Sequence, residues 1–343
     1  GAQNTTSGYE SMRSNTTGSK NTASGYHALY ANTTGQQNTA TGMDAMKANT
    51  TGGSSVGIGW EALKANTTGS ENTAVGMRAL LSNTTGTNNI AVGANSLRTN
   101  ATGSSNTAVG NGSQFASTGS NNISMGVNSL RFNTSAGSNV AIGVSALQAN
   151  TTGNSNTASG YEALRSNTTA SNNTAIGRMA LRSNTTGTAN VALGETALYN
   201  NTTANFNTGL GNGTLNTTTT GHSNTSIGYE SLYRITTGTN NVAIGRGAGS
   251  TRTTGSNNVC IGRDAGHDGT SSDSLLFIAR SNTGPSNAAT WIFGDGSGAC
   301  RQGNNATTWT QTSDERIKKN IVDSPNGLAK IDALQVRNFN YRT

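Results

Sequence analysis

Residues 21–37 read NTASGYHALYANTTGQQ, and a unit of this kind recurs along most of the chain. The glycine that follows N-T-A-S in this copy is Gly25, and equivalent glycines recur with a constant 17-residue spacing from Gly8 to Gly110. The next step, to Gly126, is one residue shorter, and the 17-residue spacing then continues to Gly262. Sixteen units in one register predict a solenoid, in which each unit forms one rung that stacks on the next.

Two positions of the unit carry most of its large aliphatic side chains. The residue before the repeat glycine is Ile, Val, Leu or Met in twelve of the sixteen units, as at Ile58 and Ile142. The residue four positions after the glycine is Leu or Met in thirteen units, as at Leu63, Leu97 and Leu164. We expect both columns to lie inside the solenoid, because only stacked rungs can cover so few apolar side chains.

The local pattern predicts one strand per rung and leaves the next segment open. N-T-A-I-G reads as a short strand of small and β-branched residues that ends at Gly. In residues 60–65, WEALKA, an acid lies three residues before a base among good helix formers, which is compatible with a single helical turn as much as with a second strand. The expected fold is therefore all-β, a parallel β-solenoid of sixteen rungs over residues 1–262, with or without one helical turn per rung.

Two large aliphatic side chains per rung make a thin core for a free-standing rod. We therefore expect a parallel homotrimer, in which three chains share an axial core.

One rung, residues 110–126, is a residue short and carries Gln114 at the Leu position. Because stacked strands on either side fix the register, the deletion is expected in the turn at residues 116–119. We also expect Phe115 to turn inward and replace the lost leucine.

Composition and charge exclude several classes of binding partner. Lys and Arg number 22 against 15 Asp and Glu, but no dense basic run or zinc-ligand cluster appears, so no nucleic-acid partner is expected. The two cysteines, Cys260 and Cys300, are forty residues apart, and Cys260 takes a position that is Ala in most units. We expect no metal and no cofactor. No apolar run is long enough to predict a membrane span.

Three surface columns have competing interpretations. Five residues after the glycine lies a basic column, made of Arg13, Lys47, Lys64, Arg98, Arg131, Arg165 and Arg182. Acids lie three residues earlier at Glu10, Asp44, Glu61 and Glu162, so we favour a salt-bridged face over a groove for a polyanion. Directly after the glycine come aromatic residues such as Tyr9, Tyr26 and Trp60, which we expect to pack between rungs or subunits rather than to stack on sugars. The recurring Asn-Thr-Thr reads as a turn ladder bonded from rung to rung, ahead of a glycosylation sequon or an ice-binding surface.

Residues 263–312 leave the glycine pattern. They contain the apolar runs LLFI at 275–278 and TWIF at 290–293, which predict buried strands of a β connector or tip.

The repeats resemble a known family of adhesins. The strings NVAIG at 241–245 and 139–143 and NIAVG at 89–93 are similar to the head repeats of trimeric autotransporter adhesins. That resemblance covers residues 1–262 and implies a trimeric left-handed parallel β-roll on a bacterial surface.

A second resemblance begins where the repeat has faded. Residues 312–321, TSDERIKKNI, resemble the opening of the C-terminal intramolecular chaperone domain of phage tail fibres, tailspikes and endosialidases. The resemblance implies that residues 313–343 begin a segment that assembles the trimer and then cuts itself off. The bond cut would join Ser313 to Asp314, assisted by Lys318. A serine hydroxyl needs a nearby base, and a partly desolvated lysine can serve as one.

The function expected from these patterns is structural. We expect a phage tail fibre shaft in the extracellular part of the virion, with a host-surface glycan or other receptor and other tail proteins as partners. A bacterial surface adhesin of the trimeric autotransporter kind is the alternative, and an ice-binding or carbohydrate-active solenoid is a weaker one. Self-cleavage is the only enzymatic activity expected, because His27, His222 and His267 have no carboxylate partners at triad or metal spacing.

Overall fold

The structure is a computed structural model, and it describes residues 1–266, 272–279, 290–297 and 300–302. The chain divides into two units, Gly1–Ala306 and Thr307–Thr343. The second unit lies outside the described residues, so the fold is that of the first. Its described residues form nineteen strands and no helix.

Sixteen strands of three residues each belong to the repeat. They are β1 (Thr5–Ser7), β2 (Thr22–Ser24), β3 (Thr39–Thr41), β4 (Val56–Ile58), β5 (Thr73–Val75), β6 (Ile90–Val92), β7 (Thr107–Val109), β8 (Ile123–Met125), β9 (Val140–Ile142), β10 (Thr157–Ser159), β11 (Thr174–Ile176), β12 (Val191–Leu193), β13 (Thr208–Leu210), β14 (Thr225–Ile227), β15 (Val242–Ile244) and β16 (Val259–Ile261).

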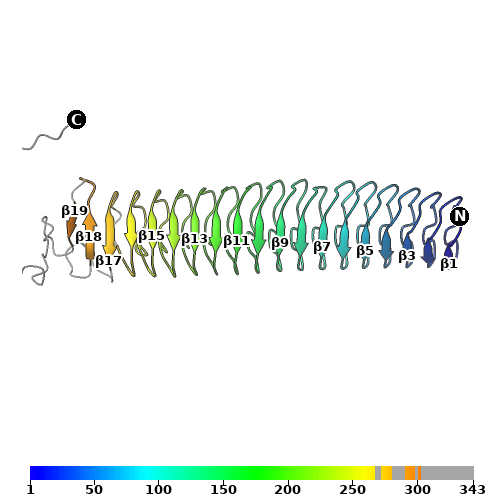
Figure 1. Cartoon of the computed structure of the whole chain (residues 1–343), viewed down its shortest axis with the longest axis horizontal. Helices are drawn as coiled ribbons and strands as arrows, with labels where there is room; N and C mark the ends of the chain where they lie inside the picture. Colours follow the sequence, from blue (N-terminus) through cyan, green and yellow to red (C-terminus); the bar gives the residue numbers. More distant parts are fainter. Residues whose placement is uncertain (267–271, 280–289, 298–299, 303–343) are drawn as a thin grey trace, which may run out of the picture. The chain divides into compact units, whose positions relative to one another are not determined.

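Each of these strands pairs in parallel with the strand of the next rung (Figure 1). The partners are one repeat apart in sequence, as in the pairing of Thr22 with Thr39. At about 4.8 Å per rung, the stack from β1 to β17 is about 75 Å long. The expected parallel β-solenoid with a 17-residue rung is thus confirmed.

The parallel stacking continues past the boundary expected at residue 262. Strand β17 (Leu276–Ala279) pairs in parallel with β16 at the same spacing as in the repeat, and Ala279 takes the position of the repeat glycine. Strands β18 (Thr290–Gly294) and β19 (Cys300–Gln302) then add to the sheet in antiparallel orientation. Both apolar runs contain strands, and the rings of Phe277 and Phe293 pack 5.0 Å apart. Trp291, by contrast, is 61% exposed rather than buried.

The segment after the repeat glycine is neither the helical turn nor the second strand that its sequence allowed. Residues two and four positions after the glycine have left-handed backbones, as at His27 (φ 54) and Leu29 (φ 52). Their N–H groups donate in opposite directions: His27 to Tyr9 of the preceding rung, and Leu29 to Ala45 of the following rung. Rung-to-rung hydrogen bonds therefore continue around this turn segment. They offset backbone conformations that cost about 1–2 kcal/mol each for residues other than glycine.

Only one of the two aliphatic columns forms the core. Leu63, Leu97 and Leu164 are completely buried, which confirms the Leu column. The residue before the glycine lies outside, and this corrects the sequence-based expectation: Ile58 is 40% exposed and Ile142 is 41% exposed. The reason is the strand's alternation, since only its middle residue, most often Ala, faces inward.

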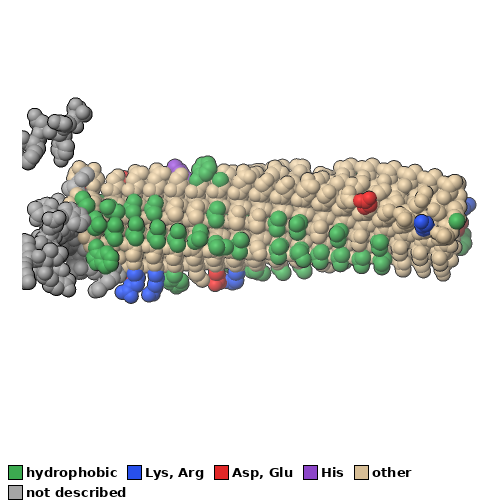
Figure 2. Space-filling model, in the orientation of Figure 1, with side chains coloured by type: hydrophobic (Ala, Val, Ile, Leu, Met, Phe, Trp, Pro, Cys, Tyr) green, Lys and Arg blue, Asp and Glu red, His purple; other side chains and the backbone are tan. Residues whose placement is uncertain are grey.

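The first and third residues of β1–β16 form a continuous surface, here called the outer strand face. Every residue on it is Val, Ile, Leu, Met, Thr or Ser, so it carries no charge from Thr5 to Ile261. Figure 2 shows hydrophobic side chains gathered in rows along the rod.

The short rung absorbs its missing residue where the sequence predicted. Ser117 and Thr118 continue the ladders of the turn, and Gly119 accepts the hydrogen bond that the turn glycine accepts elsewhere. The prediction for Phe115 is wrong, because Gln114 is the residue that turns inward. It is fully buried and bonds to Asn106 at 3.0 Å and to Ser117 at 3.1 Å. This buried polar side chain separates two apolar clusters, one ending at Ala108 and one beginning at Leu130.

Candidate binding groove

The basic column lies on the turn segment, five residues after each repeat glycine. Four acids located three residues earlier pair with it, as expected. The ion pairs join Glu10 to Arg13 at 3.0 Å, Asp44 to Lys47 at 3.1 Å, Glu61 to Lys64 at 2.6 Å and Glu162 to Arg165 at 3.5 Å. The preferred salt-bridged face is therefore present within single rungs.

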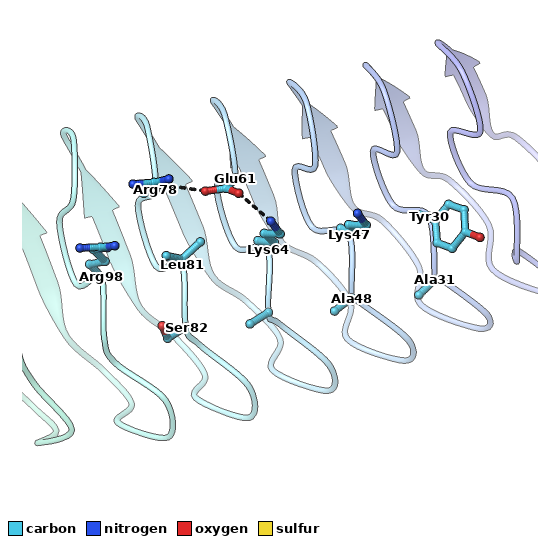
Figure 3. A pocket seen from close by; sticks show the side chains of 11 residues that line it. Tyr30, Ala31, Lys47, Ala48, Glu61, Lys64, Arg78, Leu81, Ser82 and Arg98 are labelled. Atoms are coloured by element: carbon cyan, nitrogen blue, oxygen red, sulfur yellow. Dashed lines mark hydrogen bonds and ion pairs between the residues drawn. The ribbon is translucent and has the colours of Figure 1, made fainter.

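The same acids also reach across to the neighbouring rungs. Asp44 lies 3.4 Å from the Nζ atom of Lys64, and Glu61 lies 2.8 Å from the Nε atom of Arg78. Each carboxylate thus holds two cations, one on its own rung and one on the next. The resulting chain of pairs runs through Lys47, Asp44, Lys64, Glu61 and Arg78. Figure 3 shows its last part, in which Glu61 joins Lys64 to Arg78.

The ion pairs shift the pKa values of their members so that the charged forms are favoured. Hydrogen bonds from Lys64 and then Arg78 lower the pKa of Glu61, and the bond to Glu61 raises the pKa of Lys64. Burial alone would raise the pKa of Asp44, but its contacts with Lys47 and Lys64 outweigh burial and lower it. Both carboxylates therefore remain ionised at neutral pH, and their positions hold the cations in place.

A groove of about 630 Å³ runs along this column over several rungs. Its floor is the row of small residues that follows the basic column, Ala31, Ala48, Ala65 and Ser82. One side is the column itself, with Tyr30, Lys47, Lys64, Leu81 and Arg98 on successive rungs (Figure 3). The residues that form the ion pairs thus also line a groove.

His27 lies one rung from two acids that the chain spacing hides. Its Nε2 atom is 3.2 Å from Glu10 and its Nδ1 atom is 3.5 Å from Asp44. Each acid is one repeat away in sequence, and residues one repeat apart are direct neighbours in this fold. The expectation that His27 has no carboxylate partner is therefore wrong, and the repeat period was the signal that would have found both. Within the described residues, no group of three His, Cys, Asp or Glu side chains is arranged to hold a metal ion.

The aromatic column after the glycine packs in part between rungs. The rings of Tyr9 and Tyr26 stack 5.6 Å apart, and the guanidinium of Arg78 lies 4.4 Å from the ring of Trp60. Tyr9 is nevertheless 66% exposed, so the stacking leaves much of the ring uncovered.

The Asn-Thr-Thr motif forms the predicted turn ladder. Asn49 donates from Nδ2 to Oδ1 of Asn32 on the preceding rung at 2.8 Å and to the carbonyl of Gly52 at 2.9 Å. The hydroxyl of Thr50 donates to the carbonyl of Thr67 on the following rung at 3.1 Å. The ladder asparagines from Asn32 to Asn201, such as Asn49, are fully buried, so the folded chain does not present them as glycosylation sites.

The predicted self-cleavage residues Ser313, Asp314 and Lys318 lie outside the described residues. Cys260 takes the buried Ala position opposite Ala243, as the repeat predicts, and Cys300 is exposed. The part of the chain that the structure describes contains no helix able to cross a membrane.

Comparison with known proteins adds no family to this geometry. Neither the family models nor the curated proteins compared with the chain match it.

Proposed function

We propose that this chain is the shaft of a phage tail fibre, which attaches the virion to its host and assembles as a parallel homotrimer. The outer strand face carries the assembly part of this proposal, and the resemblance of residues 312–321 to phage chaperone domains carries the tail-fibre part. The outer strand face presents exposed aliphatic side chains such as Ile142, Ile176 and Ile244, each 40–41% exposed, on a surface without charge. Monomeric proteins rarely expose contiguous apolar surfaces of this extent, which normally mark contacts with other chains.

The geometry of this face favours copies of the same chain as its partners. Its aliphatic residues recur once per rung, so a parallel copy offers side chains at the same spacing. Association would also thicken the core, in which Leu and Ala columns are the main apolar material. Three subunits, rather than two, follow from the resemblance of the repeats to trimeric adhesin heads.

The mass of the native assembly tests this subunit arrangement. Native mass spectrometry of the full chain should give three times the chain mass of 34.9 kDa. The double substitution Leu193→Glu and Ile227→Glu should dissociate the assembly, because it places charge on the outer strand face. The matched pair Thr186→Glu and Thr220→Glu, on the exposed turn, should leave it intact. A dimer or a stable monomer of the unaltered chain would overturn the trimer.

The attachment role requires a separate test on particles. Antibodies raised against residues 1–262 should label fibres on phage tails in electron micrographs and should block adsorption to the host. Labelling of a bacterial envelope instead would contradict the phage assignment and support the autotransporter-type adhesin.

Self-cleavage between Ser313 and Asp314, assisted by Lys318, belongs to the same proposal and rests on the resemblance of residues 312–321 alone. In the complete gene product, Ser313→Ala should abolish a cut that mass spectrometry maps to this bond. An unchanged cut in that variant would remove the assignment.

A further inference from the structure

The groove on the basic column is long and narrow, and it follows the solenoid axis. Tyr30 and Arg98 stand at its two ends, four rungs apart. At about 4.8 Å per rung, this distance is about 19 Å. A ligand that fills this groove must therefore extend across several rungs, whose lining side chains Figure 3 shows.

The charges along the groove do not cancel. Four cations, Lys47, Lys64, Arg78 and Arg98, face the two carboxylates of Asp44 and Glu61, which leaves two positive charges in excess. Among the described residues, Arg98 has no carboxylate partner, and its guanidinium lies 5.3 Å from the ring of Phe115. The ion pairs of Asp44 and Glu61 therefore hold neighbouring cations in place without neutralising all the positive charge of the groove. This arrangement favours a negatively charged ligand.

The backbone N–H groups of the floor are already used by the fold. The N–H of Ala48 donates to the carbonyl of Lys64, and the N–H of Ala65 donates to the carbonyl of Leu81. A peptide could not bind here by adding a strand, because that mode needs free backbone donors. A single-stranded nucleic acid needs a series of aromatic platforms, and Tyr30 is the one aromatic residue that lines the groove.

We infer that this groove binds an acidic polysaccharide laid parallel to the solenoid axis. Its carboxylate groups pair with Lys47, Arg78 and Arg98, while the C–H faces of its sugar rings pack on the alanine floor and on Tyr30. The inference deepens the proposed attachment role by naming the ligand class, and it rests on that role for its biological setting. The groove is built from the turn segment and shares no residue with the outer strand face, on which the proposed assembly rests.

Binding of polygalacturonate oligomers to the full chain tests the inference. By titration calorimetry at low salt, we expect binding to these carboxylated oligomers and none to neutral dextran of equal length. The double substitution Lys47→Gln and Arg98→Gln should weaken the affinity at least tenfold. Ala65→Leu, which fills the floor without changing charge, should weaken it by a similar factor.

The control removes the same charge elsewhere. Arg178→Gln with Arg263→Gln lies outside the groove and should change the affinity less than twofold. Thermal unfolding of every variant establishes that the rods remain folded. No binding to polygalacturonate, an equal loss in the control pair, or unaffected binding by Ala65→Leu would each overturn the inference, as would tighter binding of single-stranded DNA. Native mass spectrometry tests the homotrimer separately, so failure of the proposed assembly and failure of polysaccharide binding can be told apart.

Discussion

The Nδ2 atom of Asn66 donates to Oδ1 of Asn49 on the preceding rung and to the carbonyl of Gly69 on its own rung, each at 2.8 Å. Its own Oδ1 accepts from Asn83 on the next rung at 2.7 Å. One buried amide thus connects three rungs and closes a turn. These bonds satisfy polar groups that are buried inside the rod and out of contact with water.

Asn66→Ala should therefore destabilise the solenoid by about 1–3 kcal/mol, because it leaves buried acceptors and a buried donor without partners. Thermal unfolding followed by circular dichroism measures the effect. Thr68→Ala, at an exposed position two residues away, is the matched control and should change little. Equal midpoints for the two variants would show that the ladder contributes nothing to stability.

The repeat glycine should tolerate no side chain. Gly76 has φ +132, and an added Cβ would lie 2.7 Å from the carbonyl carbon of Gly93 on the next rung. Gly76→Ala should lower stability by more than about 2 kcal/mol, since both the conformation and the contact oppose it. At Gly57 an added Cβ would lie 2.8 Å from Cγ of the flexible Met46 side chain and 3.4 Å from the carbonyl oxygen of Ala62, so Gly57→Ala is expected to be better tolerated. If both alanines had the same effect, close stacking of the glycines would not explain their recurrence.

The left-handed turn positions should gain from glycine. Ser145 has φ 57 and is half-buried, so Ser145→Gly relieves about 1–2 kcal/mol of backbone strain against an entropic loss of about 0.5–1 kcal/mol. The expected result is a small rise in the unfolding midpoint. Ser166→Gly, at a half-buried serine whose φ is not positive, should instead lower it. A loss of stability in Ser145→Gly as large as in Ser166→Gly would contradict the strain argument.

Acid should weaken the ion pairs that Glu61 makes beside the groove. The pKa of Glu61 is lowered in the folded chain by Lys64 and Arg78, so the unfolded chain binds this proton more readily. The stabilisation is fully present above the ordinary carboxyl range and is lost as the pH falls below about 4.5 and through the lowered pKa. Midpoints measured from pH 7 to pH 2 should decline less steeply in Glu61→Gln. An identical decline in both proteins would assign the acid sensitivity to other groups.

The period and the register were predictable because a constant 17-residue spacing leaves few other folds. The Leu column was predictable for the same reason, since Leu63 and Leu97 recur at one fixed distance from the glycine. The outward position of Ile58 and Ile142 was missed because their apolar character was interpreted as burial, although a three-residue strand points its ends to the same side.

The turn segment shows where sequence patterns stop being informative. Leu29 and Leu63 adopt left-handed backbones that leucine disfavours, and only the rung-to-rung hydrogen bonds explain this choice. Gln114 likewise took the place expected for Phe115, because buried partners in Asn106 and Ser117 were not visible from the chain. The sequence shows only the column of basic residues beside the groove. The position of the alanine floor depends on the path of the turn segment, which the sequence does not show.

The constant register from one strand to the next has a consequence for how such a gene can change. Each rung contacts only the rungs before and after it, so an extra copy of the repeat can enter between any two without altering the contacts elsewhere. Near-identical repeats are also the material on which recombination slips. Duplication or loss of one repeat would then lengthen or shorten the rod by a single step of about 4.8 Å. The length of the solenoid can therefore change in evolution by one rung at a time.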